Sequence, residues 1–82
     1  MWYVYILRCF DNTFYTGITT DLERRLLEHN ESGKSAKYTR MRRPVVLIYS
    51  KNFWSKSEAS TEEYRIKQLT RKQKEELIIL DK

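Results

Sequence analysis

Two short segments near the N-terminus, both rich in aromatic and β-branched residues, constrain the fold of this chain most. Residues 2–9 read Trp-Tyr-Val-Tyr-Ile-Leu-Arg-Cys, and residues 13–18 read Thr-Phe-Tyr-Thr-Gly-Ile. Such segments favour β-strands. Asp11 and Asn12 between them are typical turn residues. The sequence therefore predicts an N-terminal β-hairpin.

The length of the hairpin loop decides which side chains share a face of the sheet. A three-residue loop at residues 10–12 would place Tyr5 opposite Gly17, so that Tyr5 and Tyr15 would be diagonal neighbours on one face. A two-residue loop would place the two tyrosines on opposite faces, because side chains alternate along a strand. The sequence leaves both registers open.

A helix is predicted from about residue 21 to residue 31. Thr20 and Glu23 have the spacing of a capping box at its start. Gly33 is suited to end the helix, since glycine adopts the backbone conformation that follows a last helical turn.

This helix carries an apolar stripe, Leu22 and Leu26, with Arg25 and His29 one turn apart at its edge. The ordinary interpretation of Arg25 is a surface cation that pairs with an acid such as Glu28, and that of His29 is a solvated helix histidine. The functional interpretation is a guanidinium directed at a phosphate and an imidazole that hydrogen-bonds a tyrosine or moves a proton.

The second half of the chain predicts a third strand and two more helices. Pro44 precedes the apolar run 45–49, which we interpret as a strand covered on both faces, so helices on the sheet are implied. The helices are predicted over about residues 56–69 and 71–80. Each is preceded by a hydroxyl residue with an acid or amide three residues later, Ser55 with Glu58 and Thr70 with Gln73.

Glu63 lies on the apolar stripe of the second predicted helix, between Ala59 and Ile66. A carboxylate is costly to bury unless it is paired or bound to a cation. The ordinary interpretations are a salt bridge to Arg25 or to a lysine, or a stripe whose edge is solvated. The remaining interpretation is that Glu63 binds a cation.

Composition limits the broad class of the protein. The chain has 82 residues, 40% of them hydrophobic, and we expect one globular domain over residues 1–82. A formal net charge of +5 favours anionic partners, which include nucleic acid, an acidic membrane surface and an acidic protein. Cys9 is the only cysteine, which excludes an intramolecular disulfide and makes a buried structural thiol the expectation. No apolar run approaches the length of a membrane span and no signal-peptide pattern is present, so we expect a cytoplasmic location.

Residues 34–43 form a basic loop with five cations, one tyrosine and no acid. Such interleaving is expected where phosphates are contacted and bases are stacked, and a solvated loop is the alternative. The residues that this hypothesis assigns to nucleic acid are Lys34, Lys37, Tyr38, Arg40, Arg42 and Arg43. We interpret a further basic cluster as an ordinary exposed face, consisting of Lys67, Arg71, Lys72 and Lys74.

Taken in order, these motifs resemble the GIY-YIG endonuclease domain, and specifically its small stand-alone bacterial group. Tyr3-Val4-Tyr5 stands where the family has Gly-Ile-Tyr, and Tyr15-Thr16-Gly17 stands where it has Tyr-Ile-Gly. Residues 21–26 match the first helix of the family, and residues 33–40 look characteristic of the stand-alone group. The resemblance covers nearly the whole chain.

Site residues follow from this resemblance position by position. Arg25 takes the place of the catalytic arginine, and His29 that of a His or Tyr one turn further on. Glu63 takes the place of the metal-binding glutamate, with Glu62 as the alternative one residue away. Ile18 stands where some excision-repair members have a lysine.

The resemblance implies an α+β fold, a three-stranded antiparallel sheet flanked by helices in the order β-β-α-β-α-α. It also implies hydrolysis of a DNA phosphodiester with one divalent cation, Mg²⁺ or Mn²⁺, held by Glu63. In that scheme Tyr5 or Tyr15 activates the water, His29 assists, and Arg25 neutralises the developing charge. A tyrosine can act as a base only if neighbouring positive charge lowers its pKa well below about 10, and we expect Arg25, the metal and the basic loop to supply that charge.

Three hypotheses are compatible with these residues. The first is a DNA endonuclease that is structure-selective or weakly specific. The second is a nucleic-acid-binding module on the same fold without turnover, and the third is a protein-interaction domain whose basic loop meets an acidic partner. Because we expect no separate targeting domain at this length, the chain would recognise nucleic-acid shape, bind weakly or use a protein partner. The sequence leaves the oligomeric state open.

Overall fold

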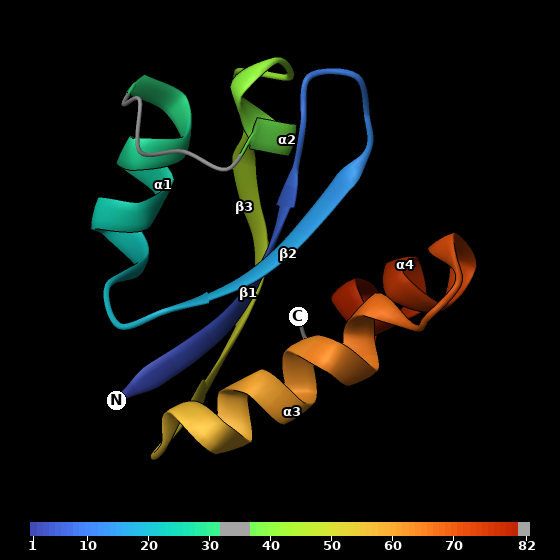
Figure 1. The fold of residues 1–82 in the computed structure, drawn as a ribbon. Helices are drawn as coiled ribbons and strands as arrows, with labels where there is room; N and C mark the ends of the chain where they lie inside the picture. Colours follow the sequence, from blue (N-terminus) through green and yellow to red (C-terminus); the bar gives the residue numbers. More distant parts are fainter. Residues whose placement is uncertain (32–36, 81–82) are drawn as a thin grey trace.

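The computed structural model describes residues 1–31 and 37–80 (Figure 1). Along the chain, its elements are β1 Trp2–Arg8, β2 Phe14–Thr19, α1 Leu22–Glu31, α2 Lys37–Arg40, β3 Val46–Phe53, α3 Lys56–Lys67 and α4 Arg71–Leu80. The strands form one antiparallel sheet in the order β2-β1-β3. The predicted fold class is confirmed, and one short helix, α2, is added inside the predicted basic loop.

The hairpin between β1 and β2 has the three-residue loop that aligns the two tyrosines. The backbone N–H of Cys9 donates to the carbonyl of Thr13 at 2.8 Å, and the N–H of Asn12 donates to the carbonyl of Cys9 at 2.9 Å. Asn12 has a φ of 67°, in the left-handed region that asparagine tolerates better than most residues. Tyr5 consequently pairs with Gly17. The first of the two predicted registers is confirmed.

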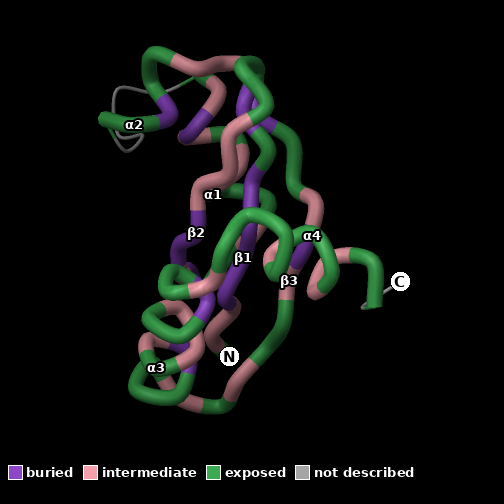
Figure 2. Tube along the Cα trace, turned by 90° about the vertical axis from the view of Figure 1, so that its right-hand side faces the viewer, coloured by how far each residue is buried: buried purple, intermediate pink, exposed green. Residues whose placement is uncertain are grey.

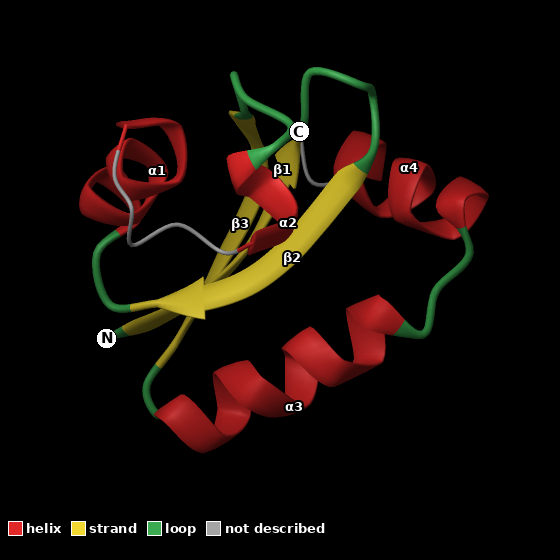
Figure 3. Ribbon diagram, turned by 45° about the horizontal axis from the view of Figure 1, so that its top comes forward, coloured by secondary structure: helices red, strands yellow, loops and turns green. Residues whose placement is uncertain are grey.

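Helices cover the two faces of the sheet as separate layers, which Figure 3 shows from above. On one face, α3 and α4 pack against side chains of β1 that include Val4 and Ile6, and the apolar helix residues in this core include Ile66, Leu77 and Ile78. On the other face, Leu22 and Leu26 of α1 pack against a second core, which contains Tyr5, Leu7, Cys9 and Val45. Because side chains alternate along β1, this one strand supplies both cores.

The prediction that the third strand is covered on both faces is wrong. In β3, Val46 is 44% exposed and Leu47 is 37% exposed, whereas four consecutive residues of β1 are buried, Val4 to Leu7 (Figure 2). The reason is topological, since β3 lies at an edge of the sheet and β1 lies at the centre. An apolar run indicates a strand, but it does not indicate which strand is central.

Helix capping confirms two sequence predictions and corrects a third. The capping box of Ser55 and Glu58 is present at the start of α3, and the side chains of Thr70 and Gln73 form the reciprocal pair before α4. At α1 the cap is Asp21, whose Oδ1 accepts from the backbone N–H of Arg24 at 3.0 Å. The predicted Thr20 cap is wrong because the helix begins one residue later, at Leu22.

Other sequence expectations concern burial and the chain's relation to membranes. Cys9 is a free, buried thiol, as predicted. Within residues 1–31 and 37–80, none of the helices has both the length and the apolar character needed to cross a membrane. Gly33, predicted to end the first helix, lies outside the described residues.

Candidate functional site

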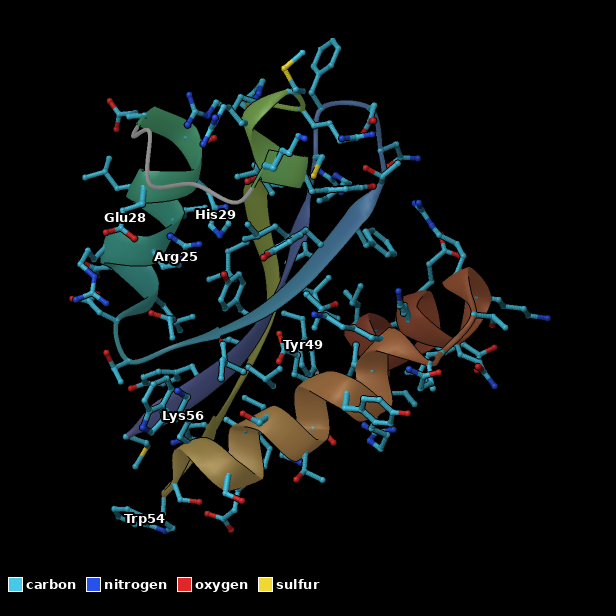
Figure 4. The ribbon with its side chains drawn as sticks, in the orientation of Figure 1. Arg25, Glu28, His29, Tyr49, Trp54 and Lys56 are labelled. Atoms are coloured by element: carbon cyan, nitrogen blue, oxygen red, sulfur yellow. The ribbon has the colours of Figure 1, made fainter. Side chains whose placement is uncertain are left out.

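The hairpin and α1 bring four of the predicted site residues together on one side of the sheet. The ring centroids of Tyr5 and Tyr15 are 6.5 Å apart, and that of Tyr15 lies 5.2 Å from that of His29. Arg25 and His29 project from α1 toward the strands (Figure 4). The three-residue loop makes this possible, because it places both tyrosines on the face that α1 covers.

A chain of hydrogen bonds runs through the centre of this cluster. The hydroxyl of Tyr5 lies 2.9 Å from Nε2 of His29, and Nδ1 of His29 lies 2.7 Å from Oγ1 of Thr39. The side chain of Arg25 also hydrogen-bonds Tyr5. Because the guanidinium can only donate, the Tyr5 oxygen accepts from Arg25, and Tyr5 can donate its own proton to Nε2 in the tautomer that leaves Nε2 unprotonated. A neutral imidazole then donates its single N–H from Nδ1 to Thr39.

Burial holds both partners of the central hydrogen bond in their neutral forms. Desolvation raises the pKa of Tyr5 to about 12, and this outweighs the lowering by the hydrogen bond from Arg25. Desolvation, with the positive charge of Arg25, lowers the pKa of His29 to about 4. Arg25 by itself therefore does not bring the pKa of Tyr5 below its usual value. The hydroxyl is too deeply buried for Arg25 to offset the loss of solvent.

Gly17 provides the space that the Tyr5 ring occupies. A Cβ atom at this position would lie 2.5 Å from the Tyr5 hydroxyl oxygen and 2.8 Å from Cζ of the same ring. Gly17 faces Tyr5 across the β1–β2 pair. The glycine of the Tyr15-Thr16-Gly17 motif is therefore required for space rather than for an unusual backbone conformation.

Arg25 pairs with an acid on its own helix and also contacts a tyrosine of the hairpin. Its Nη1 donates to Oε1 of Glu28 at 3.0 Å, so the predicted pairing with an acid on the same helix is present. The same guanidinium hydrogen-bonds Tyr5. Two partners therefore orient Arg25, and a guanidinium with five N–H donors can bind further oxygens in that orientation.

Glu63 approaches the cluster from the other layer, on α3. Its side chain is 23% exposed, and its Oε2 lies 3.2 Å from Nζ of Lys67, which is one of the pairings expected from the sequence. Its negative charge contributes to raising the pKa of Tyr5, behind burial and the nearer groups. Glu63 thus lies within electrostatic range of the tyrosine on the opposite side of the hairpin.

Glu62, the alternative metal ligand, is engaged elsewhere. Both of its carboxylate oxygens accept from Arg65 at 2.7 Å, and this pairing holds the pKa of Glu62 below its usual range. Glu62 and Arg65 line a depression beside Tyr49, which lies between the sheet and α3 (Figure 4). The geometry therefore favours Glu63 over Glu62 as the carboxylate of the site.

The donor atoms fit one particular kind of metal site. Among the described residues, no three His, Cys, Asp or Glu side chains come close enough to form a metal cage. A single carboxylate does suit Mg²⁺, which keeps several waters and is commonly held by one or two carboxylates together with substrate phosphate. Lys67, the present partner of Glu63, is 51% exposed, so opening this ion pair costs little.

Two of the five cations of the basic loop are committed to the fold. Arg42 forms a salt bridge with Asp11 at 3.0 Å and donates to the carbonyl of Tyr38 at 2.9 Å. Arg43 donates to the carbonyl of His29 at 2.6 Å. Three other residues assigned to nucleic acid belong to α2 and remain candidates, namely Lys37, Tyr38 and Arg40. Lys34 lies outside the described residues.

Sequence reasoning missed two residues that support the site. Thr39 is fully buried and bonds His29. Asn30 exchanges two hydrogen bonds with the backbone of Val45, at 2.8 and 3.1 Å, and so ties α1 to the segment before β3. Thr39 lies within the tract 33–40 but was given no role there, and Asn30 stands in no motif. Their partners lie ten and fifteen residues away in the sequence, so no local signal assigns these contacts.

Comparisons with known proteins agree with this architecture. The chain matches the family model described as the GIY-YIG catalytic domain over residues 1–76. It is 54% identical over 77 residues to the UPF0213 protein DP2720 of Desulfotalea psychrophila, covering 94% of this chain and 70% of that protein. It is 58% identical over 77 residues to the UPF0213 protein VNG_2274C of Halobacterium salinarum, covering 94% and 99%. The solution NMR structure of the UPF0213 protein BH0048 from Bacillus halodurans superposes with a TM-score of 0.63 at 52% identity, covering 98% of this chain and 85% of that one.

Proposed function

Because this chain belongs to the GIY-YIG catalytic domain family, which is a nuclease family in general terms, we propose that it hydrolyses DNA phosphodiesters with one divalent cation. The observation that carries the proposal is the 2.9 Å hydrogen bond between the Tyr5 hydroxyl and Nε2 of His29, beside the guanidinium of Arg25. A phenol that shares its proton with a neutral imidazole, next to a fixed cation, is suited to proton transfer beside a phosphate.

Arg25 binds the phosphate in this proposal. Glu28 and Tyr5 orient its guanidinium before substrate arrives, and pre-oriented donors stabilise developing charge most effectively. The planar guanidinium matches two oxygens of a phosphate. Negative charge that grows on those oxygens as water attacks phosphorus is then neutralised by Arg25.

Tyr5 and His29 take up the proton of the attacking water. Since the pKa of Tyr5 is about 12, the hydroxyl accepts a proton from water only as it passes its own to Nε2 of His29. The imidazolium that forms keeps its Nδ1–H on Thr39. A bound phosphate stabilises that imidazolium, which Arg25 and Arg43 otherwise disfavour. Tyr15 lies on the same face, 5.2 Å from the His29 ring by centroids, and is the alternative base.

Glu63 is the residue that would hold the divalent cation, since one carboxylate suffices for an ion that keeps waters and binds phosphate. When bound, Mg²⁺ or Mn²⁺ supplies neutralisation of the phosphate charge and stabilises the leaving oxygen. Lys67 must leave the carboxylate for this to happen, and its exposed side chain is free to move toward solvent.

Glu63→Gln and Glu62→Gln form a matched pair that tests the proposal. Both remove one negative charge from adjacent positions of α3, but only Glu63 lies toward Tyr5. We expect Glu63→Gln to reduce cleavage of single-stranded, flap and branched DNA by roughly two orders of magnitude in Mg²⁺ or Mn²⁺. Glu62→Gln should stay within a few-fold of wild type.

Initial rates on labelled substrates decide the outcome. Wild-type protein that cuts none of these substrates, or a Glu63→Gln variant that cuts as well as wild type, would disprove the nuclease proposal. Salt-sensitive DNA binding without any cleavage would instead support a non-catalytic binding module on the same fold.

A further inference from the structure

A groove lies at the free edge of β2, where the two helical layers meet. Among the residues that the structure describes, β2 pairs with β1 on one side only. The groove, of about 210 Å³, opens beside β2. Its lining comes from β2, α2, α3 and α4, and consists of Phe14, Tyr15, Thr16, Tyr38, Lys67 and Lys74. Aromatic side chains of β2 and α2 therefore line the groove together with two lysines, one from α3 and one from α4. Tyr15 belongs to both this groove and the candidate site.

Tyr38 contributes an aromatic ring to the lining of the groove, and neighbouring side chains fix the position of that ring. Its ring stacks on that of Tyr15, with the centroids 6.0 Å apart and the planes at 26°. The guanidinium of Arg42 lies 4.0 Å from the centroid of the Tyr38 ring and is itself held by Asp11 at 3.0 Å. The ring nevertheless remains 37% exposed. Tyr15 and Arg42 already hold the ring in place, so a base that meets the exposed part of the ring does so with little loss of entropy.

Lys67 and Lys74 are the positively charged residues that line the groove. The basic cluster that contains them was interpreted from the sequence as an ordinary exposed face, but its members differ. Arg71 lies over the ring of Phe14 at 3.9 Å and donates to the carbonyl of Asn12, so it supports the hairpin. Lys67 and Lys74 instead line the groove, and Lys67 links the groove to Glu63.

We propose that this groove binds one unpaired nucleotide of single-stranded DNA, with its base against Tyr38 and its phosphate at Lys67 and Lys74. The inference rests on the proposed function and names its substrate class. The volume is below the roughly 300–1,000 Å³ of pockets for drug-sized ligands, so it suits a single base. A base within a duplex has both faces covered by its neighbours and cannot stack on Tyr38. The protein is thereby directed to single-stranded or locally unpaired DNA next to the scissile phosphodiester.

Binding measured without metal tests the inference separately from catalysis. We expect fluorescence anisotropy in EDTA at low salt to show a short oligothymidylate binding about tenfold more tightly than either a duplex of equal length or an abasic oligonucleotide. An oligonucleotide with one 2-aminopurine should lose fluorescence on binding, because stacking quenches that base. Equal affinity for the abasic and base-bearing strands would overturn the inference on the wild-type protein alone.

Matched variants locate the effect in the groove. Tyr38→Leu should weaken binding of single strands about tenfold and remove their advantage over duplex, whereas Tyr38→Phe should retain both. Tyr64→Leu, at an exposed tyrosine of α3 outside the groove, is the control. Lys74→Ser should lower the slope of log affinity against log salt by about one, and Lys72→Ser, with the same charge change on α4, should lower it less.

The results separate this inference from the nuclease proposal. If binding depends on the base and on Tyr38 but the protein cuts no DNA, the proposed nucleotide site in the groove is supported and the proposed nuclease activity is rejected. If DNA cleavage depends on Glu63 while Tyr38→Leu and Tyr64→Leu bind single strands equally well, the proposed nuclease activity is supported and the proposed nucleotide site is rejected. If the protein binds an acidic peptide more tightly than oligothymidylate, Lys67 and Lys74 would be assigned to a protein partner. That result would also reject the proposed nucleotide site.

Discussion

Gly17 shows how one small residue leaves room for the Tyr5 side chain of the candidate site. The ring of Tyr5 passes over it so closely that a Cβ atom would lie 2.5 Å from the hydroxyl oxygen. That oxygen is the one that bonds Nε2 of His29. Displacement of the ring would therefore break the hydrogen bond that links the hairpin to α1.

We predict that Gly17→Ala destabilises the protein by about 1–3 kcal/mol, the usual cost of an overpacked core, and reduces DNA cleavage. Urea unfolding monitored by circular dichroism gives the free energy of unfolding. In a Tyr5→Leu background the ring is gone, and the same substitution should be close to neutral, or stabilising because alanine restricts the unfolded chain. Equal destabilisation in both backgrounds would show that the Tyr5 ring is not the obstacle.

Tyr5 also shows where reasoning from residue types falls short. The sequence brings tyrosine, arginine and histidine into a plausible cluster, and the structure confirms that they meet. Their protonation was not predictable, because burial raises the pKa of Tyr5 more than Arg25 lowers it. Desolvation depends on all the surrounding atoms, whereas the sequence identifies only candidate neighbours.

At the scale of secondary-structure elements, the ends of helices were predictable to within a residue or two. The caps of α3 and α4 were identified from spacing alone, since these hydrogen bonds are local. At α1, Thr20 and Asp21 are adjacent and both can cap. Only the path of the chain from β2 decides that Asp21 accepts from Arg24.

Asp21→Ala is predicted to cost about 1 kcal/mol of unfolding free energy, because it removes the side chain that caps α1. In a domain of this size such a loss lowers the melting temperature by roughly 4–8 °C. Thr20→Ala should change it by much less, as Thr20 is exposed and is not the cap. Thermal unfolding of the two variants distinguishes the positions, and a larger effect at Thr20 would contradict this assignment.

In the basic loop, the role predicted from composition differs from the contacts that two of its cations make in the structure. Five cations without an acid suggested a nucleic-acid surface, yet Arg42 pairs with Asp11 from the hairpin and Arg43 bonds the carbonyl of His29. These partners are distant in sequence. Conversely, two lysines assigned to an ordinary face line the groove beside Tyr38.

For the whole molecule, the edge of the sheet is the decisive feature. Tyr5, Arg25 and His29 belong to the layer of α1, whereas Glu63 belongs to α3 on the other face. Because β2 is an edge strand, no further strand within residues 1–31 and 37–80 separates the two layers there. This arrangement lets Glu63 influence Tyr5 and lets residues of α2, α3 and α4 share one groove.

Stability is predicted to fall as the pH drops from about 6.5 to about 4, the pKa values of His29 in its ordinary and native surroundings. In this window the unfolded chain binds a proton at His29 that the native protein does not, so unfolding is favoured. The loss reaches at most about 3 kcal/mol, at 1.36 kcal/mol per pKa unit. It is complete near pH 4, and it is absent above about 7.

Urea unfolding at several pH values checks this dependence. Arg25 and Arg43 oppose protonation of His29, and Glu28 partly favours it, so all three residues stay unchanged in the test. His29→Gln retains a polar side chain without the titration, and its stability should vary less between pH 6.5 and 4.5. The same slope in wild type and variant would assign the effect to other groups.

The sequence by itself determined the hairpin, the third strand and three of the helices, because propensity, capping and spacing are local properties, and the candidate site residues followed from the family resemblance. Only the tertiary structure decided that β1 rather than β3 is central, that Tyr5 and Tyr15 share a face, and that Tyr5 keeps its proton. It also decided which cations support the fold and which line the groove at β2. These outcomes depend on strand order, register and desolvation, which arise from contacts between residues far apart in the chain.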